Sequence, residues 1–135
     1  MYVGMMFIAH CAEHLFAGPI PFSVFTGYFA SINQPFPTAM VVLAGLIEMA
    51  VTIGLASGFM TRIAALGAVA YLFVSVGLGG HFGVGYVWVL TTGGWEFPAL
   101  WMFAVSIFAF IGGGPVSVDT WLKNKFPEMP KHSFD

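Results

Sequence analysis

Charged side chains are scarce in this chain of 135 residues. Asp, Glu, Lys and Arg together make up 7 % of the sequence, and hydrophobic residues make up 59 %. An ordinary soluble domain contains about 25 % charged residues, because its surface must be solvated by water. The composition therefore excludes a soluble globular fold. It predicts an all-α integral membrane protein whose main partner is the lipid bilayer.

Cysteine and positive charge are also nearly absent. Cys11 is the only cysteine in the sequence, so no intrachain disulfide can form. The net charge of −2 provides no basic face, and we therefore expect no nucleic-acid partner. The N-terminus lacks the basic residues of a signal peptide, and His10, Glu13 and His14 interrupt its apolar run. We expect this segment to be retained as the first membrane span.

Four apolar stretches predict one domain that forms a four-helix membrane bundle. We expect the spans over about residues 1–17, 38–60, 61–79 and 97–114. Residues 18–37 contain four prolines and many aromatic residues, which favours an interfacial or partly re-entrant connection.

The C-terminal tail carries most of the charge. Ser117 is a plausible N-cap, and SVDTWLKNKF predicts a short amphipathic helix at the membrane surface. In a four-span bundle, Arg62 lies on the same side as the lysines of the tail, which are Lys123, Lys125 and Lys131. The positive-inside rule then places both termini in the cytoplasm, as in a multi-pass protein of the inner (plasma) membrane.

Ionisable residues inside predicted spans are the strongest functional signal. A charge at the centre of a spanning helix costs roughly 2.5–3.5 kcal/mol, so such residues usually face a bundle interior and mark a pathway or a redox site. His10, Glu13 and His14 follow an i, i+3, i+4 spacing, which predicts one helical face. Glu48 lies near the middle of the second predicted span and is the strongest candidate for a functional role.

The expected topology gathers further polar groups in the outer half of the bundle, where we expect a ligand pocket. Glu48 and Glu96 are the candidate catalytic proton carriers. The candidate ligand-binding residues are His10, Glu13, His14, His81 and Trp95. A structural interpretation stays open, because buried His and Glu side chains often only hydrogen-bond one another, and carboxylates at helix ends can simply be interfacial.

The spacing of His10 and His14 could also suit a metal or an axial haem ligand. The sequence contains no CxxCH motif and no second pair of this kind. We therefore do not expect a haem or a metal.

Four segments carry a resemblance to a known family. They are FIAHCAEHLFAG (7–18), GLIEMAVTIGLASGFMTRIAALG (45–67), GGWEFPALW (93–101) and GGGPVSVD (112–119). In this order they resemble the DoxX-like membrane proteins, which are related to the small membrane subunit of thiosulfate:quinone oxidoreductase. The chain departs from that pattern at its start, where members often carry a basic residue.

The resemblance implies a four-helix membrane protein that is linked to redox systems and lies beside other membrane or peripheral subunits. The positions that match the family's recurring residues are Glu48, Arg62, Trp95, Glu96 and Asp119. We expect a structural role for Arg62 and Asp119.

Three functions remain open at this stage. The first is a membrane subunit of a quinone-linked oxidoreductase, with a quinone as its ligand and a partner that supplies the electrons. The second is a non-catalytic accessory or assembly subunit of a larger membrane complex, which the 17 glycines and the small extramembrane volume favour. The third is a small proton-coupled transporter that uses Glu13. We do not expect the chain to be catalytic alone.

Overall fold

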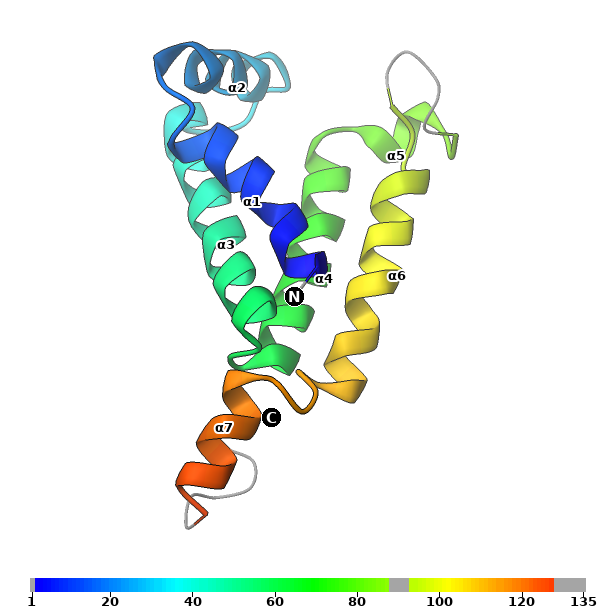
Figure 1. The fold of residues 1–135 in the computed structure, drawn as a ribbon. Coiled ribbons are helices and arrows are strands. Elements are labelled where there is room, and N and C mark those ends of the chain that lie inside the picture. The colour runs from blue at the N-terminus through cyan, green and yellow to red at the C-terminus, as the bar shows by residue number, and fades with distance from the viewer. Residues whose placement is uncertain (1, 88–92, 128–135) are drawn as a thin grey trace.

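The computed structural model describes residues 2–87 and 93–127, and all regular structure in these ranges is helical (Figure 1). The helices are α1 (Tyr2–Leu15), α2 (Pro19–Ser31), α3 (Pro37–Ser57), α4 (Thr61–Leu78), α5 (His81–Val84), α6 (Glu96–Ile111) and α7 (Val118–Lys125). The fold class is therefore all-α, as predicted.

Helices α3 and α4 form the frame of the molecule. Both are long apolar runs, and α3 begins at a proline, which fits the first turn of a helix because no N–H is lost there. Gly58 ends α3 with a φ of 70°, a left-handed conformation that favours glycine. A Cβ atom on Gly54 would lie 2.5 Å from the Cβ of Ala64, so the two helices are in close contact at their turn. From this turn they diverge (Figure 1).

Helix α1 lies antiparallel on α3. Near the start of α1, a Cβ atom on Gly4 would collide with the backbone of α3 at Ala56. Near its end, a Cβ atom on Gly45 of α3 would lie 2.6 Å from the Cγ of Leu15. The two glycines therefore allow the helices to approach more closely than any side chain would permit.

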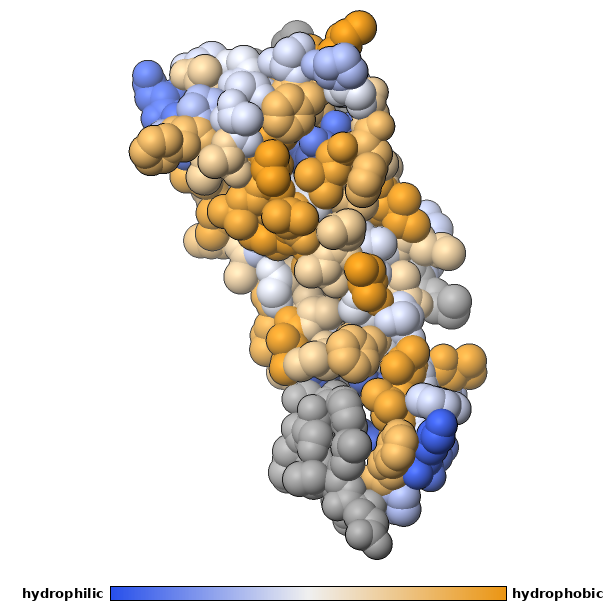
Figure 2. All heavy atoms as spheres, turned by 90° about the vertical axis from the view of Figure 1, so that its left-hand side faces the viewer, coloured by the Kyte–Doolittle hydropathy of each residue, from blue (hydrophilic) through white to orange (hydrophobic). Residues whose placement is uncertain are grey.

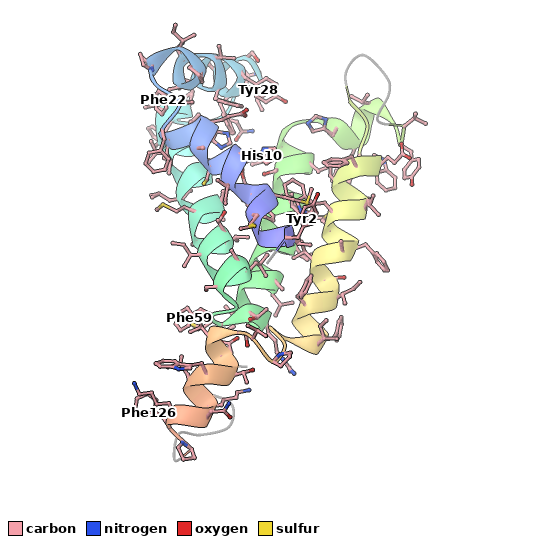
Figure 3. All side chains as sticks on the ribbon, viewed as in Figure 1. Tyr2, His10, Phe22, Tyr28, Phe59 and Phe126 are labelled. Carbon is pink, nitrogen blue, oxygen red and sulfur yellow. The ribbon has the colours of Figure 1, made fainter. Side chains whose placement is uncertain are left out.

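The aromatic connection forms a helix, α2, which turns by 91° from the direction of α1. Pro19 and Pro21 occupy its first turn, where proline does not interrupt the hydrogen bonds of a helix. Figure 3 shows Tyr28 near the end of α2 that faces α4 and α5, and its hydroxyl donates a hydrogen bond of 3.2 Å to the carbonyl of Gly79. The sequence indicated only a connection here, because four prolines obscured the helical run between them.

Helix α6 packs against α4 and completes the core. The buried core residues come from α1, α3, α4 and α6, namely Phe7, Val51, Leu55, Ala65, Ala68, Leu72, Trp101 and Val105. The rings of Phe7 and Trp101 lie 4.4 Å apart and join α1 to α6. The N–H groups of Trp95 and Glu96 donate to the carbonyls of Gly85 and Tyr86, which fixes the start of α6 beside the end of α5.

Helix α7 is docked on the turn between α3 and α4. Ser117 caps it by accepting a hydrogen bond of 3.2 Å from the N–H of Thr120, as the sequence predicts. The carboxylate of Asp119 accepts hydrogen bonds from the N–H groups of Met60 (2.7 Å) and Thr61 (3.0 Å) and from the Thr61 hydroxyl (2.8 Å). Asp119 of α7 thereby caps the N-terminus of α4.

In the part of the chain that the structure describes, α3 and α4 are long and apolar enough to cross a membrane, and the bent pair of α1 and α2 would make a third span. Helix α6 is apolar but shorter, with 16 residues. The predicted count of four spans and the cytoplasmic position of both termini therefore stay predictions. Figure 2 shows hydrophobic side chains along the middle of one face, with the most hydrophilic ones toward its two ends, as expected of a surface that contacts lipid.

Candidate ligand-binding site

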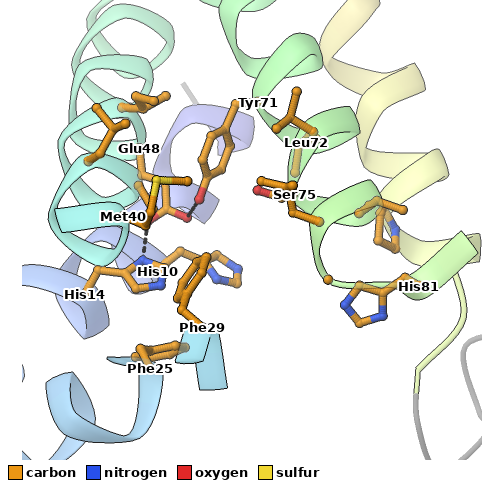
Figure 4. Close-up of a pocket in the computed structure, with 18 of the residues that line it drawn as sticks. His10, His14, Phe25, Phe29, Met40, Glu48, Tyr71, Leu72, Ser75 and His81 are labelled. Atoms are coloured by element: carbon orange, nitrogen blue, oxygen red, sulfur yellow. Dashed lines mark hydrogen bonds and ion pairs between the residues drawn. The ribbon is translucent and has the colours of Figure 1, made fainter. Parts of the chain in front are cut away.

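Glu48 lies between three helices at the centre of a hydrogen-bonded group. Its side chain is buried, with 4 % of the residue exposed. The hydroxyl of Tyr71 on α4 donates to Oε1 at 2.6 Å, and Nδ1 of His14 on α1 lies 2.7 Å from Oε2 (Figure 4). We call His14, Glu48 and Tyr71 the polar triad. Both carboxylate oxygens have partners, so the buried glutamate is satisfied within the protein.

The close approach of α1 to α3 brings the triad together. Gly45 precedes Glu48 by nearly one helical turn, and a Cβ atom there would lie 3.0 Å from the Cβ of His14. With no side chain at residue 45, the end of α1 can lie directly against α3. The imidazole of His14 therefore reaches the carboxylate.

The contact between His14 and Glu48 couples two protonation patterns. When the proton is on Nδ1, the neutral ring offers Nε2 as a hydrogen-bond acceptor. When the proton is on Glu48, Nδ1 accepts it and Nε2 carries a hydrogen that can be donated. The two patterns differ by one proton in total, so Nε2 must lose or gain a proton as another proton moves across the 2.7 Å contact. Within the described residues, the structure gives Nε2 no hydrogen-bond partner.

The triad forms part of the wall of a cavity of about 430 Å³, which we call the triad cavity. Small-molecule sites typically have volumes of about 300–1,000 Å³. The remaining wall is largely apolar and aromatic, with Phe25 and Phe29 from α2, Leu72 from α4, and Trp101 from α6. The ring of Phe25 lies 4.4 Å from that of His14 and fixes one face of the imidazole.

Two further histidines line the same cavity. His10 is exposed, belongs to α1, and lies 5.3 Å from the Trp101 ring, measured between centroids. His81 belongs to α5, and its Nδ1–H donates to the carbonyl of Gly93 at 2.8 Å. Among the described residues, no three His, Cys, Asp or Glu side chains are placed to hold a metal ion. The histidines and the polar triad offer hydrogen-bonding groups to a ligand in the cavity.

Three sequence candidates lie outside the triad cavity. Glu13 is exposed and does not line it. Successive residues of a helix are about 100° apart, so His14 can face α3 while Glu13 points elsewhere. Trp95 packs on Tyr86, with centroids 4.7 Å apart, and Glu96 is exposed in the first turn of α6. The expected single face thus contributes two of its three residues to the cavity, namely His10 and His14.

Arg62 and Asp119 lie at the opposite end of α4 from the cavity. Asp119 caps α4, as described above, and is buried. Arg62 follows in the first turn of α4 and is half-buried, with Nε 3.7 Å from where a Cβ atom of Gly112 would lie. Neither residue contacts Glu48, whose hydrogen-bond partners are His14 and Tyr71.

Sequence reasoning missed Tyr71 and the aromatic residues of α2. Tyr71 and Ser75 are spaced i, i+4 in an otherwise apolar run, and both line the triad cavity. That spacing places both hydroxyl groups on one face of the helix, which was the signal in the sequence for a polar site. Phe25 and Phe29 repeat it on α2, but it could be interpreted only once α2 was known to be a helix.

A comparison with protein-family models identifies the family of the chain. The model of the DoxX family matches residues 1–82, which include α1 to α4 and all three residues of the polar triad. No curated protein and no solved structure matches the chain. The match covers more than half of the 135 residues. Together with the long apolar helices, it shows that the chain is a membrane protein that belongs to the DoxX family.

Proposed function

We propose that the triad cavity binds the ring of a quinone and that the protein is the membrane subunit of a quinone-linked oxidoreductase. In this proposal it resides in the inner membrane with both termini in the cytoplasm. The observation that carries the proposal is the polar triad in the wall of a largely apolar cavity of about 430 Å³.

A quinone needs both properties of this cavity. Its planar ring favours apolar and aromatic walls, which Phe25, Phe29 and Trp101 provide. Its carbonyl oxygens need hydrogen-bond donors, and Nε2 of His14 becomes one whenever Glu48 holds the shared proton. The cavity thus combines an apolar site for the quinone ring with a side chain that can donate a hydrogen bond to a quinone carbonyl.

The triad can also deliver a proton when the quinone is reduced. Nε2–H of His14 gives its proton to the carbonyl oxygen, and the proton of Glu48 moves across the 2.7 Å contact to Nδ1. The hydroxyl of Tyr71 stabilises the carboxylate that remains, at 2.6 Å. This relay supplies one proton of the quinol, and the other carbonyl oxygen takes its proton from a separate donor.

In this proposal the electrons come from another subunit. A quinone takes up as many electrons as protons when it becomes a quinol, so a reductant is needed beside the proton donor. Membrane or peripheral partner subunits would deliver electrons to the quinone, while this chain binds it and supplies a proton.

The test is quinone binding to the protein in lipid nanodiscs. The variants His14→Ala and Glu48→Ala should bind a quinone about threefold to tenfold more weakly, because a hydrogen bond between neutral groups contributes about 0.5–1.5 kcal/mol. Glu13→Ala is the matched control, since this exposed carboxylate neighbours His14 but lies outside the cavity. Tyr71→Phe is the milder variant if Glu48→Ala does not fold.

A quinone that fails to bind the unmodified protein would overturn the proposal. So would equal affinities of Glu48→Ala and Glu13→Ala. If the protein instead co-purified tightly with a larger complex whose activity did not depend on Glu48, the accessory role would be favoured.

A further inference from the structure

We infer that the ligand reaches the triad cavity from the lipid, through an opening between α3 and α4 that also holds its hydrocarbon tail. This inference rests on the proposed function and extends it. It assigns the substrate to the class of membrane-dissolved amphiphiles, with a planar ring that accepts hydrogen bonds and an apolar tail.

Two rows of side chains face each other across the cavity. Met40, Leu43 and Ile47 follow an i, i+3, i+7 spacing on α3, and Tyr71, Val74 and Leu78 follow it on α4. Figure 4 shows the cavity between these two helices, with α1 behind it and α2 across one end.

Part of each row is both in the cavity wall and on the surface. Leu43 is 50 % exposed, Val74 is 53 % exposed and Leu78 is 39 % exposed, although all three line the cavity. They therefore mark an edge at which the cavity is open, which we call the lateral mouth.

The lateral mouth leads into lipid. Both helices that form it are candidate membrane spans, and its exposed side chains are all apolar. On the outer surface of α3, Leu43 also borders a second apolar groove, which runs along Phe36, Pro37, Val42 and Leu46. A hydrocarbon tail that leaves the cavity past Leu43 would therefore continue along an apolar surface.

The other sides of the cavity are less suited to a tail. Helix α2 covers the end away from the α3–α4 turn and is tied to α4 by the hydrogen bond from Tyr28 to Gly79. Between α1 and α6 the cavity edge carries the exposed imidazole of His10 beside Trp101. An imidazole at that edge favours water and protons over a hydrocarbon chain.

The test narrows the lateral mouth and compares two ligands with the same ring. The mouth variants are Leu43→Trp and Val74→Trp. The controls are Ile53→Trp on α3 and Leu66→Trp on α4, which are as exposed but do not line the cavity. The ligands are a benzoquinone with a decyl tail and the same ring with a methyl group. Affinities are measured in nanodiscs as mole fractions in the lipid, so that partitioning into the bilayer does not enter the comparison.

We expect the mouth variants to bind the decyl quinone at least about tenfold more weakly, which equals about 1.4 kcal/mol. The methyl quinone should bind them as it binds the unmodified protein, and the control variants should bind both ligands normally. Mouth variants that bind both ligands normally would overturn the lateral mouth and leave the proposed function standing. If the mouth variants lost affinity for both ligands equally, the placement of the tail in the lateral mouth would be overturned, because the substitutions would then have changed the site of the ring. If the unmodified protein bound neither quinone, the proposed function and this inference would fail together.

Discussion

Replacing Asp119 by alanine removes the acceptor of three hydrogen bonds at the start of α4. The donors are the N–H of Met60 and both the N–H and the hydroxyl of Thr61. Asp119 and Thr61 are both buried, with 6 % and 2 % exposed. Water therefore cannot simply replace the carboxylate.

The expected loss follows from these three contacts. A hydrogen bond contributes about 1 kcal/mol net to stability, and loss of a helix cap costs about 0.5–2 kcal/mol. Three bonds to one buried carboxylate therefore predict a loss of about 3 kcal/mol in the free energy of unfolding for Asp119→Ala. Asp119→Asn keeps one acceptor oxygen and should lose about half as much.

Unfolding of the reconstituted protein by increasing fractions of a denaturing detergent measures this loss. Asn124→Ala is the control, because Asn124 is exposed on the same helix and its replacement should change stability by no more than about 0.5 kcal/mol. An Asp119→Ala protein as stable as the control would refute the reasoning, since it would mean that the capping contacts contribute nothing.

Four further variants can be tested with the reconstituted protein. Gly4→Ala should lower the free energy of unfolding by about 1–3 kcal/mol, because its Cβ atom would collide with the backbone of α3. Gly27→Ala has open space around the added atom and should be neutral or slightly stabilising. Tyr71→Phe should cost about 1 kcal/mol in unfolding free energy and weaken quinone binding less than Glu48→Ala does. In proteoliposomes, we expect the Glu13→Gln variant and the unmodified protein to show the same rate of cation efflux when a proton gradient is imposed. A cation efflux that is lost in Glu13→Gln would favour the transporter function instead.

The main helices could be predicted from the sequence because their limits are local. The span expected over about 38–60 is α3 (Pro37–Ser57), and that over 61–79 is α4 (Thr61–Leu78). A proline begins α3 and Gly58 ends it, so neighbouring residues alone carry both signals. Helix α2 escaped prediction because prolines usually interrupt helices, and only their position in the first turn makes them compatible with one.

The location of the site could be predicted from the sequence, but the hydrogen-bond partners of Glu48 could not. Glu48 stood out because a carboxylate is costly in an apolar span. Its partner could have been any of several ionisable residues, because the choice depends on how closely α1 approaches α3. Gly45 decides that distance, yet in the sequence it is one glycine among 17. Tyr71 was missed for a different reason. A tyrosine in a membrane span costs little free energy, so the sequence carried little signal for a functional role.

The unequal lengths of the apolar helices have a consequence for the surrounding bilayer. At 1.5 Å per residue, the 21 residues of α3 extend over roughly 31 Å and the 16 residues of α6 over roughly 24 Å. A bilayer with a hydrocarbon core of about 30 Å matches α3. If α6 is a span, as the sequence predicts, the bilayer must become thinner beside it. Such a protein would deform its membrane unevenly around its circumference. Each ångström of difference between helix length and bilayer thickness costs a fraction of a kcal/mol. The length of the lipid chains should therefore influence which side of the protein associates with other membrane proteins.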